Sequence, residues 1–290
     1  MSLKKKISAV LELFKIRITL FVAVTTGFGY LLFKGGFDIG MAFSSLGILL
    51  LAFSSAALNH IQERKTDAMM NRTKDRPLPS GRITLMEAVV YSSAAFISGT
   101  VIMLAFFSPL AYVTGLTCLI WYNLIYTPMK KINSLAIIPG SVIGALPPVA
   151  GWLAAGGGLL DPQVLLIAFF FFIWQIPHFW LLLLIFNSDY EQAGFPTLIG
   201  LFNDKQLARI TFVWTSVSAL SVLLFPLFKV TAISFFSFIL PVLALWLMIS
   251  ATALLRKDLS RLSYNIIFRR INYFALLVIV FVSIDKVLLS

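Results

Sequence analysis

Apolar runs of about 20 residues, long enough to cross the ~30 Å hydrocarbon core of a bilayer as helices, recur along the whole chain and restrict its possible folds. Nine such runs are predicted, at residues 16–34, 41–59, 85–107, 109–127, 135–155, 164–186, 207–228, 230–254 and 268–288. They must be helices, because an unpaired backbone in lipid is too costly and the alternating pattern of a membrane barrel is missing from the sequence.

The composition agrees with this interpretation. Only 12% of the 290 residues are charged and 59% are hydrophobic, with a mean hydropathy of +0.94, whereas a soluble domain carries roughly a quarter charged residues. The longest polar segment, near residues 59–81, is too short to form a soluble domain. We therefore expect a single all-α polytopic transmembrane domain over residues 1–290.

The basic residues predict the orientation of the bundle. With a cytoplasmic N-terminus, twenty of the 23 Lys and Arg residues fall on the inner side, leaving only Lys34, Lys229 and Lys286 outside. This is the bias of the positive-inside rule. The net charge of +11 therefore indicates topology and contact with anionic membrane lipids, and it gives no support to nucleic-acid binding.

The chain carries few signals for processing or for another compartment. The N-terminal MSLKKK lacks a signal-peptide cleavage pattern and is too short for a transit peptide, so the first span is expected to be retained. The single cysteine, Cys118, excludes an intrachain disulfide. These features favour an integral protein of a prokaryotic plasma membrane, with its polar loops on the cytoplasmic side.

Three polar residues follow the second apolar run with helical spacing. Asn59, Glu63 and Asp67 are four residues apart, so on a continuing helix they drift only ~80° and rise ~12 Å along one face. Such a stripe of oxygen ligands suits a hard cation, and Mg²⁺ typically combines one or two carboxylates with substrate phosphates. The pattern is short, and a loop that is charged only because topology requires it is the alternative interpretation.

Basic residues follow the stripe closely. Arg72, Lys74, Arg76 and Arg82 lie within the same polar segment. Arg binds phosphate oxygens in a bidentate manner, and Lys acts as a point charge. Metal ligands and basic residues together indicate a diphosphate site.

A second acidic segment follows the sixth apolar run, in FNSDYEQAGFPTL. Asp189 and Glu191 fall on the same predicted side of the membrane as the first polar loop. Two acidic segments that face each other over one bundle can hold two metal ions around one diphosphate. An ordinary solvated turn remains the alternative for this segment.

Two further groups of residues are candidates for substrate contacts. YTPMKK, at the inner end of the fourth run, offers Tyr126 and Lys130 to a phosphate, although Lys130 and Lys131 could equally be simple membrane anchors. WQIPHFW places His178 inside the sixth run, where polar groups are functional candidates. A packing histidine next to a kink at Pro177 is the alternative.

Prolines also occur in the fifth run. Pro147 and Pro148, in GSVIGALPPVAGW, are expected to bend this run and to open a cavity.

Taken together, these motifs resemble the UbiA superfamily of intramembrane prenyltransferases, and most closely its heme O synthase (protoheme IX farnesyltransferase) branch. The resemblance is carried by NHIQERKTD with MNRTKDRPLPSGR, then YTPMKK, GALPPVAGW, WQIPHF and DYEQAGFPTL, over residues 59 to 198, and the opening LFKIRITLF also fits. It implies a nine-helix bundle around a central cavity and Mg²⁺-dependent departure of diphosphate from an allylic donor.

The heme branch implies farnesyl diphosphate as donor and the vinyl group of heme b, a substrate rather than a cofactor, as acceptor. It assigns Mg²⁺ to Asn59, Glu63, Asp67 and Asp189, as one or two ions, because the position four residues after Asp189 is Ala193 where many relatives have a second carboxylate. The diphosphate contacts would be Arg72, Lys74, Arg76, Tyr126 and Lys130, with His178 as a heme contact or axial ligand. Association with enzymes of heme A synthesis or terminal oxidase assembly is also implied.

Two other functions compete with this one. A prenyltransferase of the same superfamily could act on an aromatic acid or quinone precursor, although YTPMKK, WQIPHF and AGFPTL favour heme. A transporter would bind its ion near the middle of the membrane, whereas the charged residues here gather at one surface.

Overall fold

The computed structural model describes residues 2–192, 194, 196, 198, 201–232, 235–256 and 261–289, with the side chains of 187–192, 235–237 and 261 outside that description. Within these residues the protein is helical throughout and contains no strand. Nine of its helical segments are long and apolar enough to cross a membrane. The all-α fold and the number of predicted spans are therefore confirmed.

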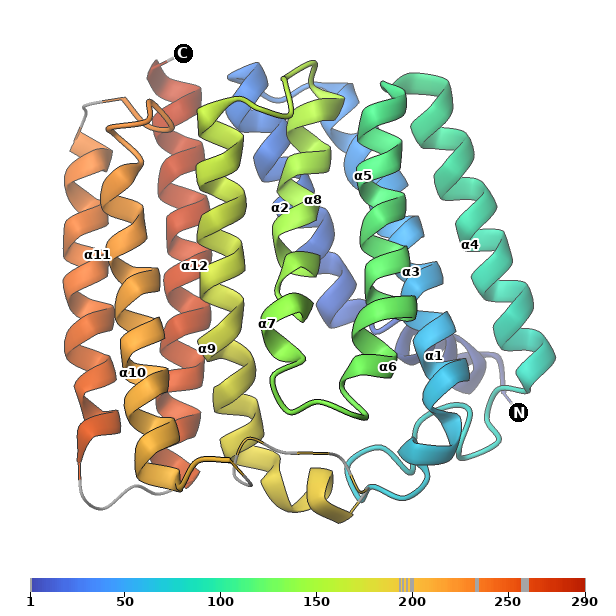
Figure 1. Ribbon diagram of the computed structural model, residues 1–290. Helices are drawn as coiled ribbons and strands as arrows, with labels where there is room; N and C mark the ends of the chain where they lie inside the picture. The colour runs from blue at the N-terminus through green and yellow to red at the C-terminus, as the bar shows by residue number, and fades with distance from the viewer. Residues whose placement is uncertain are drawn as a thin grey trace.

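The helices follow one another in an up-and-down order (Figure 1). They are α1 (Leu3–Leu13), α2 (Ile16–Lys34), α3 (Ile39–Asp67), α4 (Leu85–Phe106), α5 (Pro109–Ile120), a π-helical segment (Trp121–Tyr126), α6 (Thr127–Met129), α7 (Ile137–Gly140), α8 (Val142–Ala154), α9 (Pro162–Gln192), α10 (Asp204–Ser221), α11 (Phe235–Ala251) and α12 (Arg261–Leu289), with 3₁₀ turns at Val222–Leu224 and Thr252–Leu255.

Local sequence signals explain where several helices begin. Asp38 caps α3, its Oδ1 accepting from the Met41 amide at 2.9 Å. Thr84 and Glu87 form a reciprocal capping box at the start of α4. Such caps satisfy amide groups that have no partner inside the helix. The capping box at Thr84 marks the C-terminal end of the polar segment between α3 and α4.

The long helices pack side by side in a closed circuit. Contacts run in the order α2, α3, α4, α5, α8, α9 and α12, each helix contacting the next. Helix α12 also contacts α2, which closes the circuit. Helices α2 and α8 also cross closely at two glycines. A Cβ on Gly29 would lie 1.9 Å from the Pro148 carbonyl oxygen, and one on Gly151 would lie 1.9 Å from that of Thr26. Only glycine permits this approach, which holds the first and fifth spans together.

The interruptions in the fifth and sixth spans do not lie at the prolines that were expected to cause them. The fifth span is interrupted at Ser141, between α7 and α8, and Pro147 and Pro148 sit inside α8. Likewise, α9 contains Pro177, but its non-helical backbone is at Phe186. Proline removes only its own hydrogen bond to the residue four positions earlier. The carbonyl of Ile143 that Pro147 leaves free accepts from the Cys118 thiol at 3.4 Å.

One end of the bundle gathers the polar segments. Figure 1 shows the segment after α3, the connection from α6 to α7 and the end of α9 at the same end, with the C-terminus at the opposite end. Helix α1, which had not been predicted, packs here through Ala9 and Leu13 against Ala57 and Ile83. The polar end therefore has its own small core, which supports the residues described next. A central cavity remains a prediction.

Candidate active site

The polar stripe predicted on α3 lies inside the protein. Helix α3 continues to Asp67, beyond the predicted end of the span at residue 59. Asn59 and Asp67 are fully buried and Glu63 is 4% exposed. A buried carboxylate is costly unless it is paired or binds a metal. The topological interpretation of a solvated loop is thus not supported for these three residues.

Each carboxylate has a cationic partner from another segment. Arg76 Nη1 donates to both oxygens of Asp67, at 2.8 Å each. Lys130 Nζ lies 2.5 Å from Glu63 Oε1. Arg76 comes from the polar segment after α3, and Lys130 follows α6. The site therefore joins three of the motifs that the sequence had singled out separately.

The third member of the stripe, Asn59, contacts Lys15, one of the twenty basic residues expected on the inner side of the membrane. Its Oδ1 accepts from Lys15 Nζ at 2.5 Å, and its Nδ2 donates to Thr127 Oγ1 at 3.0 Å. Lys15 connects α1 to α2 with a left-handed backbone (φ 49°). That conformation is uncommon for a residue with a side chain. The place of Lys15 in LFKIRITLF, directly before the first apolar run, was the sequence signal.

Electrostatics mark Lys15 as unusual. Burial lowers the pKa of Lys15 to about 7, and the positive charges of Arg76 and Lys130 act in the same direction, while Glu63 and Asp67 oppose it. Three basic groups and two carboxylates therefore share one small volume. A negatively charged ligand beside Lys15 would favour its protonated form.

A π-helical segment supplies the wall opposite α3. Within Trp121–Tyr126, the Tyr122 hydroxyl lies 3.2 Å from Lys15 Nζ, and the carbonyl of Asn123 accepts from Gln62 Nε2 at 3.1 Å. Tyr126 stacks on Tyr122. Single π-helical turns are frequent at functional sites, because the wider turn frees backbone carbonyls. Here the hydrogen bond from Gln62 to the carbonyl of Asn123 connects α3 to the fourth span.

His60, next to Asn59, is also buried within this cluster. Its exposed fraction is 1%, and neither ring nitrogen has a hydrogen-bond partner among the described residues. Unsatisfied buried polar atoms are rare in native structures, and each calls for an explanation. His60 is therefore a candidate ligand-binding residue beyond the predicted set.

The other residues predicted to contact phosphate do not all lie in the same place. The Arg72 guanidinium lies over the Phe186 ring at 5.1 Å, which connects the first polar segment to the end of α9. Lys74 is exposed and its Nζ donates to Asn71 Oδ1 at 3.2 Å, away from the cluster. The Lys130 ammonium also lies over the Tyr126 ring, at 5.7 Å. Lys130 and Tyr126 are therefore brought together, whereas Lys74 is not.

The second acidic segment is a helix where a loop had been predicted. Helix α9 continues through residues 187–192 to Gln192. The side chain of Asp189 lies outside the described residues, so its expected role as a metal ligand stays a prediction. No three His, Cys, Asp or Glu side chains of the described chain gather as a metal site. Asn59, Glu63 and Asp67 offer one amide and two carboxylates.

His178 lies on α9 and is held by α12. Its Nδ1 is 2.9 Å from Asn272 Oδ1, while Asn272 Nδ2 donates to the Phe268 carbonyl at 2.6 Å. The ring lies between Trp174 and Phe268, with centroid distances of 4.9 and 4.8 Å. Asn272 was not identified from the sequence, because it follows Arg269 and Arg270 at the polar start of the last run, where a polar side chain is ordinary.

Comparisons with known proteins agree on one family. The model of the UbiA prenyltransferase family matches residues 21–272. A protein of Oleidesulfovibrio alaskensis named protoheme IX farnesyltransferase is 36% identical over 221 residues, covering 76% of this chain and 78% of that protein. One of the same name from Geobacter sulfurreducens is also 36% identical, covering 77% and 82%.

Solved structures show the same fold. A structure described as digeranylgeranylglyceryl phosphate synthase is similar with a TM-score of 0.79 at 16% identity, covering 98% of this chain and 99% of that one. A UbiA homolog from Archaeoglobus fulgidus, bound to GPP and Mg²⁺, has a TM-score of 0.68 at 14% identity, covering 97% of this chain and 100% of that one.

Proposed function

This chain belongs to the UbiA prenyltransferase family, and we propose that it transfers the farnesyl group of farnesyl diphosphate to a vinyl group of heme b, making heme O. The C–O bond of the donor breaks and its electron pair leaves with diphosphate. The vinyl π electrons form the new C–C bond, and water adds to the resulting cation with loss of a proton. The product carries a hydroxyethylfarnesyl side chain.

The cluster at the polar end of the bundle carries this proposal. Asn59, Glu63 and Asp67 fit Mg²⁺, because they offer an amide and two carboxylate oxygens on one buried helix face. Asp189 would complete the set. When bound, Mg²⁺ would stabilise the negative charge that develops on the departing diphosphate.

The cations of the site have a second role in this scheme. Arg76 and Lys130 neutralise Asp67 and Glu63 in the structure described here. Once those carboxylates hold a metal, the two cations have phosphate oxygens as partners, with Lys15 beside them. Preformed positive groups aimed at a leaving diphosphate lower the barrier, because they need no reorganisation as charge develops. Arg72 and Tyr126 are further proposed contacts.

His178 is proposed as the heme contact. Because Asn272 Nδ2 donates to a backbone carbonyl, its Oδ1 faces His178 as an acceptor, so the imidazole proton sits on Nδ1. The lone pair is then on Nε2, the form that binds iron as an axial ligand. The heme and the prenyl donor are both membrane-soluble, and we expect them to enter from the bilayer.

One assay separates this function from its competitors. Purified protein is incubated with farnesyl diphosphate, Mg²⁺ and heme b, and products are identified by mass. Heme O is the expected product. Prenylation of 4-hydroxybenzoate or a quinone precursor in its place would indicate another acceptor, and absence of any prenylated product would contradict a transferase of this kind.

The cellular setting is also part of the proposal. The basic residues favour a cytoplasmic N-terminus and a prokaryotic plasma membrane, with the diphosphate handled at the inner surface. Association with enzymes of heme A synthesis or terminal oxidase assembly would pass the product on within the membrane. The orientation can be tested with single cysteines placed near Lys74 and near Lys34. Each membrane face is then exposed to an impermeant thiol reagent, and the cysteine that reacts identifies the face.

A further inference from the structure

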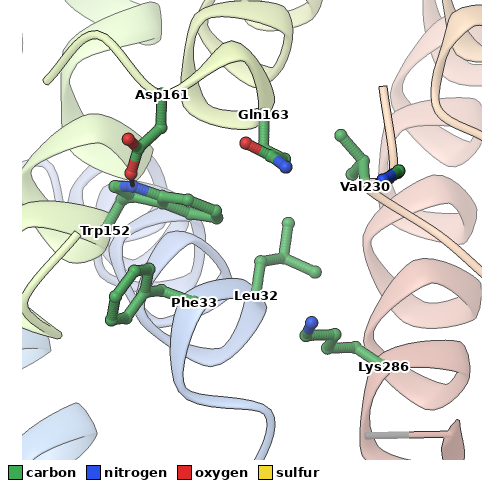
Figure 2. Close-up of a pocket in the computed structure, with 8 residues that line it drawn as sticks. Leu32, Phe33, Trp152, Asp161, Gln163, Val230 and Lys286 are labelled. Carbon is green, nitrogen blue, oxygen red and sulfur yellow. Dashed lines mark hydrogen bonds between the residues drawn. The ribbon is translucent and has the colours of Figure 1, made fainter. Parts of the chain in front are cut away.

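A cavity of about 220 Å³ opens at the end of the bundle opposite the Glu63 and Asp67 cluster. It lies among the ends of α2, α8, α9 and α12, and Lys229, Lys286 and Asp161 line it. Figure 2 shows the Lys286 amino group pointing toward Leu32. The prenyl-transfer reaction proposed above gives this cavity no role.

The charge of the cavity is positive. Neither Lys229 nor Lys286 forms an ion pair with any residue that the structure describes. The Asp161 carboxylate is instead occupied by two donors, Trp152 Nε1 at 2.9 Å and the Gly158 amide at 2.7 Å. These two ammonium groups are two of the three basic residues predicted on this side of the membrane. An anion is the ligand that such a cavity can bind.

The backbone at Lys229 is held in an unfavourable conformation. Its φ of 57° is left-handed, and within the described residues Lys15, at the candidate active site, is the one other non-glycine residue with a positive φ. The turn is fixed by a hydrogen bond from the Val230 amide to the Phe225 carbonyl at 2.9 Å. Strained backbone concentrates at binding sites, so this turn supports a role for Lys229 in binding.

A groove of about 540 Å³, apolar apart from Asp38, Ser45 and Ser283, lies along α2, the start of α3 and α12. On α12, Ile279 and Ser283 line the groove and Lys286 lines the cavity, and these residues share one helix face because they are four and three positions apart. On α2, Leu31 lines the groove and Leu32 lines the cavity. A ligand can therefore place a charged end and an apolar chain in the two spaces at once.

We propose that this region binds one anionic phospholipid, with its phosphate between Lys229 and Lys286 and an acyl chain in the groove. Leu20, Val24 and Phe37, which line the groove, are exposed, so the groove faces the lipid around the bundle. In the cavity the two lysines outnumber the one carboxylate, Asp161, and the carboxylate of the groove, Asp38, is occupied by the Met41 amide and the Tyr30 hydroxyl. A small soluble anion would leave the groove unused, and a neutral lipid would leave the charge unmatched. This inference does not depend on the proposed heme chemistry.

Native mass spectrometry of detergent-purified protein with added phosphatidylglycerol tests the proposal. Wild-type protein should retain one lipid, and the Lys229→Ala/Lys286→Ala variant should bind it roughly 30-fold more weakly, since each basic residue near anionic lipid is worth about a factor of five. Lys34→Ala is the matched control, because Lys34 lies at the same end but does not line the cavity. An equal loss in Lys34→Ala, or none in the double variant, would overturn the site.

A second variant separates the groove from the lysines. Ser283→Trp fills the groove without altering charge and should also weaken phosphatidylglycerol retention. Phosphatidylcholine and inorganic phosphate, at matched concentration and ionic strength, should protect wild-type protein against thermal unfolding less than phosphatidylglycerol does. Equal protection by phosphate would indicate a free-anion site, and equal protection by phosphatidylcholine would show that charge does not select the ligand; either result rejects the proposal.

Discussion

Arg76 Nη1 lies 2.8 Å from both carboxylate oxygens of Asp67, and the Asp67 side chain is almost completely buried. This pair joins the last turn of α3 to the polar segment that follows it. Because the carboxylate is buried, its partner is needed for stability as well as for function. The two roles can be measured separately.

Replacement of Arg76 by Ala should destabilise the protein by about 3 kcal/mol, because it leaves a buried carboxylate without its cation. Asp67→Ala should abolish farnesyl transfer while costing less stability, since the remaining Arg76 is partly exposed. The double variant Asp67→Ala/Arg76→Ala should regain most of the stability lost in Arg76→Ala and stay inactive. Thermal unfolding in detergent and product formation check these expectations. Wild-type turnover by Asp67→Ala would contradict the metal assignment.

Lys130 and Lys131 provide a matched comparison on adjacent residues. Lys130 pairs with Glu63, whereas Lys131 is exposed. Lys130→Ala should lower kcat/KM for farnesyl diphosphate by roughly 100-fold, the usual effect of losing one group that stabilises transition-state charge. Lys131→Ala should have little effect. If both variants lost activity equally, Lys130 would be only a membrane anchor, which was the alternative interpretation of YTPMKK.

Lys15 should be required for diphosphate binding although it was not among the predicted site residues. Its ammonium contacts Asn59 and Tyr122, and Lys15→Met removes the charge at similar size. We expect Lys15→Met to raise the KM for farnesyl diphosphate. Arg17 is an exposed neighbour, and Arg17→Gln should leave the KM unchanged. Unaltered steady-state kinetics of Lys15→Met would exclude Lys15 from the diphosphate site.

Asn272 should act through His178. Asn272→Leu removes the acceptor that places the proton on Nδ1, and loss of such a partner typically weakens a metal ligand 10- to 100-fold. Heme titration followed by absorption should show weaker binding and an altered spectrum, and His178→Ala should show the same change more strongly. Tyr273→Phe, at an exposed neighbouring position, is the control. A wild-type heme spectrum in His178→Ala would rule out axial ligation.

Local features of the sequence predicted much of this molecule. The nine spans follow from the length of the apolar runs, because a bilayer requires about 20 residues in a helix. The common helix face of Asn59, Glu63 and Asp67 follows from their spacing, because helical periodicity is a property of consecutive residues. Bends were predicted less well, because Pro147 and Pro177 lie within helices and the interruptions fall at Ser141 and Phe186.

The sequence by itself therefore determined the membrane-spanning helices and the stripe of oxygen ligands, since both depend on neighbours along the chain. Only the tertiary structure decided which cation meets which carboxylate. It brought Lys130 to Glu63, Lys15 to Asn59 and Asn272 to His178. Each of these pairs joins segments far apart in sequence, and their meeting depends on how whole helices cross and pack.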